Sequence, residues 1–494
     1  MTNMTIAWIA APFFMGFVIY LLPELDRWLA LGITSLSASY AVQIFLLDTP
    51  LNIQLLDSFG VTLIVDQLSG FFILTNVLVT TAVICYSWQT AESSGESQHF
   101  FYMQLLILHG SVNSTFICAD FISLYVALEV ISIASFLLIA YPRTDRAIWV
   151  GLRYLFVSNT AMLFYLVGAV LVYQANHSFN YAGLDNSPPE AIALIFLGLL
   201  AKGGIFVSGL WLPLTHSEAE SRVSAMLSGV VVKAGVFPLV RCALMLESID
   251  PIVRFFGVST ALLGVGFAVF AKDTKRMLAF HTISQLGFVL AAPVVAGFYA
   301  LTHGLVKSAL FLIAGVLPSR NFKELQHQPI ETSIWIALVI ASFSISGFPL
   351  LSGFGAKVLT TKNLLPWQVM AMNIAALGTA ISFAKFIFLP HQKYLSGKEK
   401  TTLKVKSGFW WAMTILLGGL IAANAVYYEA YTLKNIVKPL ATIAIGWLAY
   451  LLIFKKSGLK LPRVMEQFDH LIGIMVITLI LLFWTIWTRS QLSI

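Results

Sequence analysis

Several ionisable residues of this sequence stand inside apolar runs, where a charge is least stable. In LLAKGGIF (Leu199–Phe206), Lys202 has only uncharged residues around it. A charge at the centre of a membrane helix costs about 2.5–3.5 kcal/mol or more, so such residues are expected to have a function. The ionisable residues in apolar runs are Glu129, Arg153, Lys202, Lys233, His303, Lys307, Lys357 and Lys385.

The chemistry that fits these residues is proton transfer. Burial lowers the pKa of a lysine by up to about 3–5 units, and a nearby carboxylate raises it again. A lysine balanced between the two influences can bind and release a proton near neutral pH. His303 and Lys307 share one face of a helix, and a histidine titrates in the range that suits a link between lysines. A row of such groups, bridged by water, would conduct protons across part of a membrane.

Simpler explanations exist for some of these residues. Lys385 lies within about two turns of the end of its apolar run, and Arg153 lies near a loop, so either side chain can extend along its helix to water. Glu129 and Lys202 can also form a structural ion pair, which would be compatible with proton transfer. Lys202, Lys233, Lys307 and Glu129 lie deeper, where extension of the side chain to water is a poorer explanation.

No pattern in the sequence indicates a metal site or a cofactor. Cys85, Cys118 and Cys242 stand singly in or beside apolar runs, without a CxxC spacing. His303 has no second histidine or cysteine at a ligand spacing. We therefore expect no bound metal ion, no cofactor and no disulfide framework.

The elements that must position these residues are membrane helices. Of the 494 residues, 58% are hydrophobic and 11% are charged, whereas soluble domains carry roughly 25% charged residues. Sixteen apolar segments each approach the length that a helix needs to cross a bilayer. They lie at 4–23, 27–47, 68–88, 101–118, 121–141, 149–173, 190–212, 223–246, 252–271, 277–293, 297–317, 332–360, 367–390, 408–428, 437–454 and 469–488. The sequence therefore predicts an all-α polytopic membrane protein.

The basic residues gather in the connections that follow odd-numbered segments. The main clusters lie at 143–146, 272–276, 320–323, 393–406 and 455–463. Connections after even-numbered segments carry little beyond Arg254, Lys362 and Lys434. By the positive-inside rule the first set faces the cytoplasm, and both termini lie on the other side. The net charge of +7 thus belongs to short loops and does not indicate nucleic-acid binding.

Two of the segments contain interruptions. The seventh runs into WLP at Trp211–Pro213, and the twelfth contains Pro349 in SGFPLLSGFG. Proline removes a backbone donor, and in a membrane such breaks are tolerated only where protein or trapped water satisfies the freed groups. Paired broken helices point to the ion path of a transporter. Lys202 precedes its break and Lys357 follows its own, as two units inserted in opposite orientations would give.

Five stretches resemble the antiporter-like membrane subunits shared by respiratory complex I and the multisubunit Mrp cation/proton antiporters. They are ALEVISIASFLLIAY (127–141), WLPLTHSEAESRVSAMLSGVVVKAG (211–235), KDTKRMLAFHTISQLGF (272–288), LTHGLVKSALFLIAG (301–315) and SGFPLLSGFGAK (346–357). The family commonly has proline just ahead of WLP and Asp-Ala after it, whereas this chain has Ser208–Gly209 and Leu-Thr.

The resemblance implies about 14 core transmembrane helices with two inverted five-helix repeats, each with one broken helix, and about two extra C-terminal helices. The implied divisions are N-terminal helices at 1–100, a first repeat at 101–246 broken at Pro213, a second repeat at 252–390 broken at Pro349, and C-terminal helices at 408–494. We call 101–246 the first unit and 252–390 the second unit.

The resemblance also assigns roles to residues. The implied proton path consists of Glu129, Lys202, Lys233, His303, Lys307 and Lys357. Glu129 would be the electrostatic partner of Lys202, and Lys357 would end the path. Accessory positions are Arg153, Lys385 and Asp66, although Asp66 in VDQLSGFF can equally be the N-cap of the third segment.

The implied function is that of a proton-translocating subunit of an Mrp-type Na⁺ (cation)/H⁺ antiporter, with the D type favoured by the length and the short tail. It would be a transport subunit rather than a catalyst, in a bacterial cell or thylakoid inner membrane. Its partners would be other hydrophobic subunits, protons, a monovalent cation and the bilayer, without nucleic acid. Two alternatives remain: a membrane subunit of a complex I-like NAD(P)H or ferredoxin:quinone oxidoreductase, and a scaffold of an anion or inorganic-carbon uptake machine.

Overall fold

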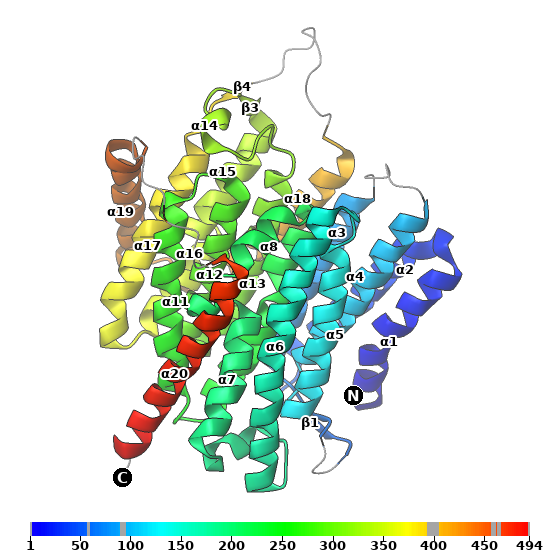
Figure 1. The fold of residues 1–494 in the computed structure, drawn as a ribbon. Helices are drawn as coiled ribbons and strands as arrows, with labels where there is room; N and C mark the ends of the chain where they lie inside the picture. Colours follow the sequence, from blue (N-terminus) through cyan, green and yellow to red (C-terminus); the bar gives the residue numbers. More distant parts are fainter. Residues whose placement is uncertain are drawn as a thin grey trace.

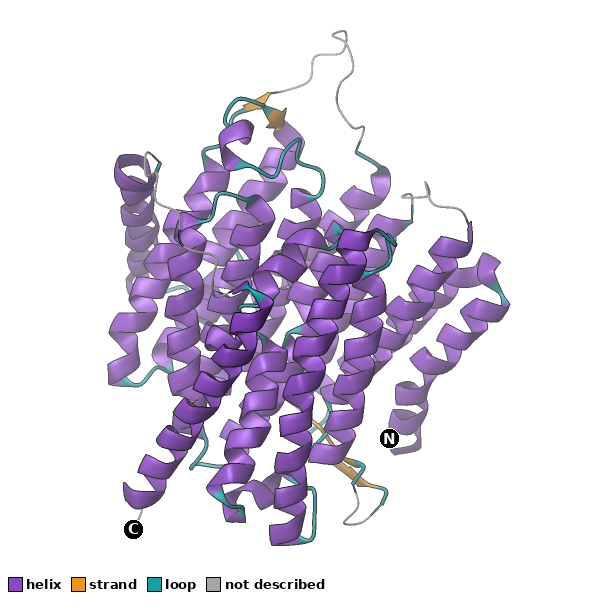
Figure 2. Ribbon diagram, in the orientation of Figure 1, coloured by secondary structure: helices purple, strands orange, loops and turns teal. Residues whose placement is uncertain are grey.

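In the described part of the chain, most residues lie in helices, and the strands form two short pairs (Figure 2). The structure, a computed structural model, describes residues 2–56, 60–88, 95–392, 405–455, 461 and 466–492. The basic residues predicted to lie in cytoplasmic loops at 393–404, 456–460 and 462–465 fall outside the described residues.

The α-helices run in chain order through the membrane units. They are α1 (Thr2–Leu21), α2 (Asp26–Phe45), α3 (Gln67–Ser87), α4 (Gly95–Thr115), α5 (Phe121–Ile139), α6 (Asp145–Asn176), α7 (Pro189–Gly203), α8 (Leu212–Glu218), α9 (Ser221–Met226), α10 (Lys233–Met245), α11 (Asp250–Phe270), α12 (Thr274–Ala291), α13 (Ala296–Ala314), α14 (Phe322–Leu325), α15 (Thr332–Ser346), α16 (Ser352–Lys362), α17 (Pro366–Ile387), α18 (Ser407–Val426), α19 (Leu433–Ala449) and α20 (Phe468–Leu492).

Shorter elements connect or continue these helices. The 3₁₀ turns are η1 (Pro23–Leu25), η3 (Tyr181–Asn186), η4 (Phe206–Gly209), η6 (Pro293–Val295) and η7 (Tyr428–Ala430), and the π-helical turns are η5 (Leu227–Val231) and η8 (Tyr450–Phe454). Strand β1 (Leu51–Gln54) pairs antiparallel with β2 (Thr62–Val65), Leu51 opposite Val65. Strand β3 (Ile330–Glu331) pairs parallel with β4 (His391–Gln392), Ile330 opposite His391.

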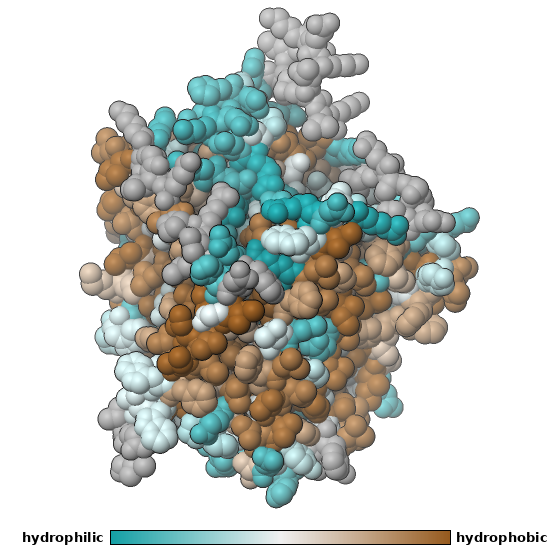
Figure 3. Space-filling model, in the orientation of Figure 1, coloured by the Kyte–Doolittle hydropathy of each residue, from teal (hydrophilic) through white to brown (hydrophobic). Residues whose placement is uncertain are grey.

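The predicted all-α polytopic fold is confirmed, since each of the sixteen apolar segments overlaps a helix. In the described part of the chain, 13 helices are long and apolar enough to cross a membrane. On the face shown in Figure 3, apolar residues cover the middle of the molecule, and hydrophilic residues gather at the upper end and along the lower edge. Both ends of the chain lie toward the lower end of the bundle, whereas α14, β3 and β4 lie at the upper end (Figure 1).

Helix α13 occupies the centre of the bundle. All of its residues are buried, and it packs against α3, α9, η5, α12, α15, α16 and α18. It therefore joins the first unit, which supplies α9 and η5, to the second, which supplies α12, α15 and α16. His303 and Lys307 both lie on this helix.

The two C-terminal helices pack against different units. Helix α19 lies along α17, and α20 lies along α7 and η4. Just ahead of α20, Glu466 accepts two hydrogen bonds from Arg276 Nη2, at 2.6 Å to Oε1 and 2.7 Å to Oε2. This ion pair fixes the start of α20 against the basic end of α12.

Candidate functional site

The deepest predicted residues lie inside the protein rather than at its lipid-facing surface. Lys233 and Lys307 have 0% of their surface exposed, and Lys202 and His303 have 2%. No side chain buried to this degree reaches water by extending along its helix. Each amine must therefore be stabilised by protein oxygens or by trapped water.

Lys202 lies in the last turn of α7, directly before a break in the helix. Its Nζ donates to Leu128 O at 3.1 Å, Ser132 Oγ at 2.5 Å and Ser158 Oγ at 2.9 Å. The break is at Gly204, which has a φ of +69°, rather than at Pro213. Pro213 lies in the first turn of α8, where the missing N–H would have no helical partner in any case.

Glu129 does not contact Lys202 as an ion pair. Both residues are described, and no oxygen of Glu129 lies within 4.0 Å of the amine, although the two charges interact through space. Glu129 Oε1 is buried without a hydrogen-bond partner. The two serine hydroxyls and a carbonyl, rather than the carboxylate, make the direct contacts to Lys202.

Lys233 follows the π-helical turn η5 and donates from Nζ to the carbonyl of Gly229 in that turn. Single π turns in α-helices are frequent at functional sites. The helices around Lys233 approach closely because glycines line the contacts. A methyl group on Gly235 would overlap the backbone of Gly203, and one on Gly304 would lie 3.5 Å from Lys233 Nζ. Lys233 is thus placed between the break after Lys202 and the central helix α13.

On α13, the predicted pair occupies one face of the helix. Lys307 Nζ donates to Leu278 O of α12, and both ring nitrogens of His303 lack a partner. A cavity of about 10 Å³ lies between His303 and Lys357 and is also lined by Gln285, Tyr299 and Thr302. That volume is roughly what one water molecule needs.

Lys357 lies on α16, after the second break, where Gly347 has a φ of +86°. Its buried Nζ has no hydrogen-bond partner. The side chain lines a crevice of about 960 Å³ between α16, α17 and α19. The other amines along this crevice belong to Lys362, Lys434 and Lys438. The break at Pro349 is therefore in the predicted place, between α15 and α16.

Two accessory residues have structural partners. Arg153 is buried and donates from Nη2 to the carbonyl of Glu466, ahead of α20. Lys385 donates from Nζ to Ala268 O at 3.3 Å, Val269 O at 2.7 Å and Ala271 O at 2.8 Å. These are the last carbonyls of α11, which a cation stabilises. Neither side chain extends freely into water.

Asp66 is an N-cap and an ion-pair partner at once. Its Oδ1 accepts from Ser69 N at 3.0 Å, at the start of α3, and from Arg241 Nη2 at 2.9 Å. Burial by itself raises the pKa of Asp66, but the bonds from Arg241 and Ser69 outweigh it, so the net pKa lies below the ordinary value. Asp66 thus ties α3 to α10, away from the row of lysines.

Sequence reasoning missed two buried histidines beside this row. His216 on α8 and His281 on α12 are both 0% exposed, and both ring nitrogens of His281 lack hydrogen-bond partners. Both interact electrostatically with Lys307. A histidine in an apolar run can be neutral, so it does not show the cost that singled out the lysines.

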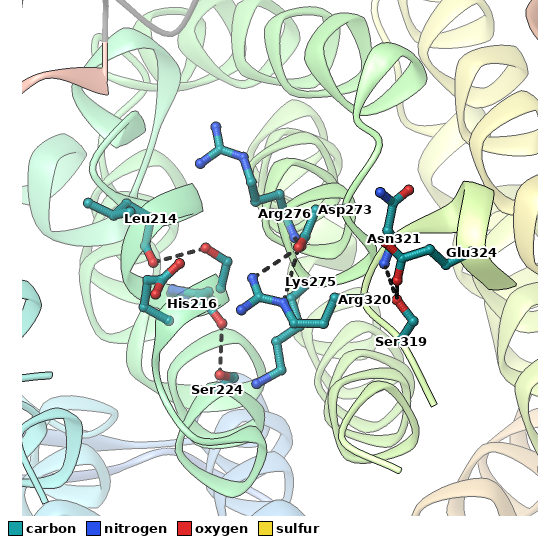
Figure 4. Close-up of polar contacts among 12 residues, drawn as sticks. Leu214, His216, Ser224, Asp273, Lys275, Arg276, Ser319, Arg320, Asn321 and Glu324 are labelled. Atoms are coloured by element: carbon teal, nitrogen blue, oxygen red, sulfur yellow. Dashed lines mark hydrogen bonds and ion pairs between the residues drawn. The ribbon is translucent and has the colours of Figure 1, made fainter. Parts of the chain in front are cut away.

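The upper end of α12 is held by a cluster of loop contacts (Figure 4). Asp273 caps α12 by accepting from Arg276 N at 2.8 Å and pairs with Arg320 at 3.0 Å. Lys275 donates to the carbonyl of Ala219 at 2.9 Å, and Ser224 donates to the carbonyl of His216 at 2.8 Å. These contacts fix the helix that carries His281 against α8.

Comparison with known proteins gives a consistent result. The family described as "NADH:quinone oxidoreductase/Mrp antiporter" matches residues 118–382, which include every predicted path residue. The D-type subunit of the Na(+)/H(+) antiporter of Alkalihalophilus pseudofirmus is 27% identical over 422 residues, covering 77% of this chain and 84% of the relative.

Two solved structures share the fold. A chain of the Mrp complex from Dietzia sp. matches with a TM-score of 0.73 and 19% identity, covering 96% of this chain and 100% of that chain. A chain of the archaeal membrane-bound sulfane sulfur reductase matches with a TM-score of 0.75 and 22% identity, covering 90% and 99%.

Proposed function

This chain belongs to the NADH:quinone oxidoreductase/Mrp antiporter family, and on that premise we propose that it is the proton-translocating, D-type subunit of a multisubunit Mrp-type Na⁺ (cation)/H⁺ antiporter. One observation carries the proposal. Buried amines and a histidine follow one another through neighbouring helices: Gly203, next to Lys202, meets Gly235 near Lys233, Lys233 Nζ lies beside Gly304 of α13, and His303 of α13 shares a cavity with Lys357. The last member faces a crevice of about 960 Å³.

The geometry supports stepwise proton transfer along this row. Lys202 is surrounded by three oxygens that stabilise its ammonium form. Lys233 interacts electrostatically with both His303 and Lys307, so protonation of one amine disfavours protonation of the next. A charge added near Glu129 would shift the proton occupancy of Lys202, with which Glu129 interacts electrostatically. The water-sized cavity beside His303 connects the row to Lys357.

The proposed setting is the inner membrane of a bacterial cell or a thylakoid, with both termini on the non-cytoplasmic side. Its partners there are other hydrophobic subunits, and the exchanged ions are protons and a monovalent cation. Relatives described as part of an antiporter and as part of an Mrp complex support this assignment. Large apolar side chains such as Trp411, Leu452 and Trp484 are exposed on α18, η8 and α20, as a chain surrounded by lipid and membrane subunits requires.

The test is cation/proton exchange by the assembled complex in sealed vesicles. Lys233→Ala and Lys307→Ala should each lower exchange at least tenfold while the complex still assembles, because each removes a proton acceptor that no neighbour replaces. Lys406→Ala, at an exposed position ahead of α18, is the matched control and should exchange normally. Normal exchange by assembled Lys307→Ala would overturn the proposal.

A second candidate function is the membrane arm of a redox-driven complex. The similarity in fold to an archaeal respiratory membrane complex, with a TM-score of 0.75, favours it. Under this reading the same row of residues would conduct protons, with the driving force supplied by other subunits. The co-purified proteins distinguish the two candidates: flavin and iron–sulfur proteins support the redox complex, and small hydrophobic membrane proteins support the antiporter.

A further inference from the structure

Two buried groups of the second unit have no role in the path described so far. The first is the imidazole of His281 on α12, which is 0% exposed and has no partner at either ring nitrogen. The second is the amine of Lys385 on α17, which caps α11. Leaving buried polar atoms unpaired is costly, so a ring with two such atoms calls for an explanation beyond packing.

His281 packs against α17, the helix that carries Lys385. Its ring is 4.7 Å from that of Phe383, which stands two residues before Lys385 on α17. It interacts electrostatically with Lys307, Lys385 and Lys357. Lys307 also bonds to the helix of His281, because its Nζ donates to Leu278 O, almost one turn before His281 on α12.

Lys385 and Lys357 open toward opposite ends of the bundle. Lys385 lines a pocket of about 130 Å³ together with Lys272, Lys323 and Gln326, beside α14 at the upper end in Figure 1. Lys357 lines the crevice that reaches Lys362 and Lys434, at the ends of α16 and α19 remote from α14. The second unit therefore has a lysine-lined opening toward each end.

The two residues of α13 are placed one toward each opening. His303 faces the water-sized cavity that it shares with Lys357, whereas Lys307, one turn further along, contacts α12 near His281. Helix α13 thus offers a branch in the row, with one arm leading to Lys357. On the other side, Lys307 bonds to α12, and His281 of α12 packs against Phe383 of α17, the helix that carries Lys385.

We propose that His281 is a relay residue that carries protons between Lys307 and the pocket at Lys385, so that the second unit exchanges protons with both ends of the bundle. The inference rests on the proposed function. Lys385 first releases a proton to the pocket that it lines and becomes a neutral amine. The ammonium of Lys307 then gives a proton to one ring nitrogen of His281, directly or through water, and the imidazolium releases a proton from its other nitrogen to the Lys385 amine. The ring ends the step neutral, and each amine changes by one proton.

The titratable groups around the His281 ring favour the onward transfer of a proton over its retention on the ring. The groups that interact with His281 itself are His303 and Lys307 on α13, Lys357 on α16 and Lys385 on α17. Two further groups act on these neighbours: Lys233 on α10 interacts with His303 and Lys307, and His216 on α8 interacts with Lys307.

On α11, Asp250 pairs with Arg254, which binds the carbonyl of Ala291 at the other end of α12. Among the described groups that interact with His281 there is no carboxylate. A proton on the ring is therefore not held by a counter-ion and is repelled by protonation of any neighbouring amine.

The experiment is proton/cation exchange by the oriented, reconstituted complex with the pH varied on one side at a time. In the wild type, the rate should depend on pH at both sides. His281→Gln keeps a polar side chain that cannot carry a proton. The exchange rate of this variant should no longer depend on the pH at the Lys385 end and should still depend on the pH at the Lys357 end. Lys357→Gln should show the reverse.

His109→Gln is the matched control. His109 is as buried as His281, with 0% exposed, but its ring nitrogens bond to Thr80 at 3.2 Å and Ser37 at 3.0 Å in α3 and α2. This variant should assemble with the pH dependence of the wild type at both sides. A structural effect of replacing a buried histidine would appear in His109→Gln as well.

Lys385 tests the relay from its other end. Lys385→Arg keeps a cation on the last carbonyls of α11, whereas Lys385→Gln keeps only hydrogen bonding. Lys385→Gln should lose the same one-sided pH dependence as His281→Gln, and this variant decides the matter if His281→Gln fails to assemble. Unchanged dependence at both sides in the glutamine variants, with Lys307→Ala inactive, would overturn the relay and leave the proposed function standing. Full exchange by Lys307→Ala would overturn both.

Discussion

The two broken helices hold their lysines in opposite ways. In the first unit, Lys202 precedes the break and its amine has three oxygen partners, from Leu128, Ser132 and Ser158. In the second unit, Lys357 follows the break and its amine has none. The first arrangement stabilises a charge inside the bundle, and the second presents an amine to a crevice of about 960 Å³.

The difference comes from the order of lysine and break. Lys202 ends its helix, so its side chain meets the hydroxyls of the neighbouring helices α5 and α6. Lys357 lies in the second turn after its break, and its stem packs on the break itself: a methyl group on Gly347 would lie 2.9 Å from Lys357 Cδ. One amine is thus enclosed, while the other has an opening beside it. We infer that the enclosed site holds a proton and the open site releases it.

The largest expected effect comes from making Lys202 resemble Lys357. The double variant Ser132→Ala/Ser158→Ala removes both hydroxyl partners of the Lys202 amine. A buried charge that loses its partner costs about 3–5 kcal/mol, so the assembled complex should melt at a clearly lower temperature and exchange at least tenfold more slowly.

The control for this variant is Ser135→Ala. Ser135 lies on the same helix as Ser132 and is buried, but it is not among the hydrogen-bond partners of the Lys202 amine. It should melt and exchange as the wild type does. Equal losses in the control and the double variant would show that the hydroxyls do not stabilise the Lys202 amine.

A second prediction concerns the ion pair that fastens the first unit. Asp66→Asn keeps the N-cap of α3 but loses the charged bonds from Arg241, which are worth about 1.5–3 kcal/mol. The folded-state pKa of Asp66 lies below the ordinary value. Its contribution is therefore complete above the unfolded-state pKa and is lost as the pH falls through the folded-state pKa.

The measurement is thermal melting from pH 7 down to about pH 3, around the ordinary aspartate pKa. The wild type should lose part of its stability in the acid range, and Asp66→Asn should start lower and change less there. If both proteins lost the same stability on acidification, Asp66 would not be the titrating group.

The third prediction treats the two breaks as equivalent. Gly204 has a φ of +69° and Gly347 has a φ of +86°. Placing alanine in such a backbone conformation costs about 1–3 kcal/mol of stability, so Gly204→Ala and Gly347→Ala should both destabilise the protein. Similar losses of melting temperature are expected for both. Gly418→Ala on α18 is the control, because no atom lies within 4 Å of the added methyl group; it should be neutral or stabilising by up to about 1 kcal/mol.

The smallest effect on stability is expected at the open site. Lys357→Gln removes an amine that makes no hydrogen bond, so the melting temperature should hardly change, within the equivalent of about 1 kcal/mol. Lys202→Gln, which loses bonds to two hydroxyls and a carbonyl, should be clearly less stable. Comparable melting of the two glutamine variants would contradict the distinction between an enclosed and an open lysine.

The sequence predicted the helices and the deepest amines because both follow from local properties. An apolar run of about 20 residues has to cross the bilayer as a helix, and the sixteen segments do form helices. Lys233 and Lys307 were identifiable because a cation in such a run is costly, and both are fully buried.

Other features depended on groups far apart in the chain. The break in the first unit is at Gly204 rather than Pro213, because proline is acceptable in the first turn of α8. The hydrogen-bond partners of Lys202 come from two other helices. Glu129 interacts with Lys202 electrostatically but makes no direct bond to it. His281 carried no signal in the sequence, since a histidine costs little when neutral, and only its position among three amines gives it a role.

By itself, the sequence determined that this chain lies in a membrane, crosses it repeatedly as helices and keeps amines inside, because these properties follow from the cost of moving charges and backbone polar groups into hydrocarbon. The tertiary structure decided which oxygens surround each amine, which amine is enclosed and which lies at an opening. Those properties depend on distances between helices, which are set by packing at glycines such as Gly203 and Gly235 and are not encoded in any single segment.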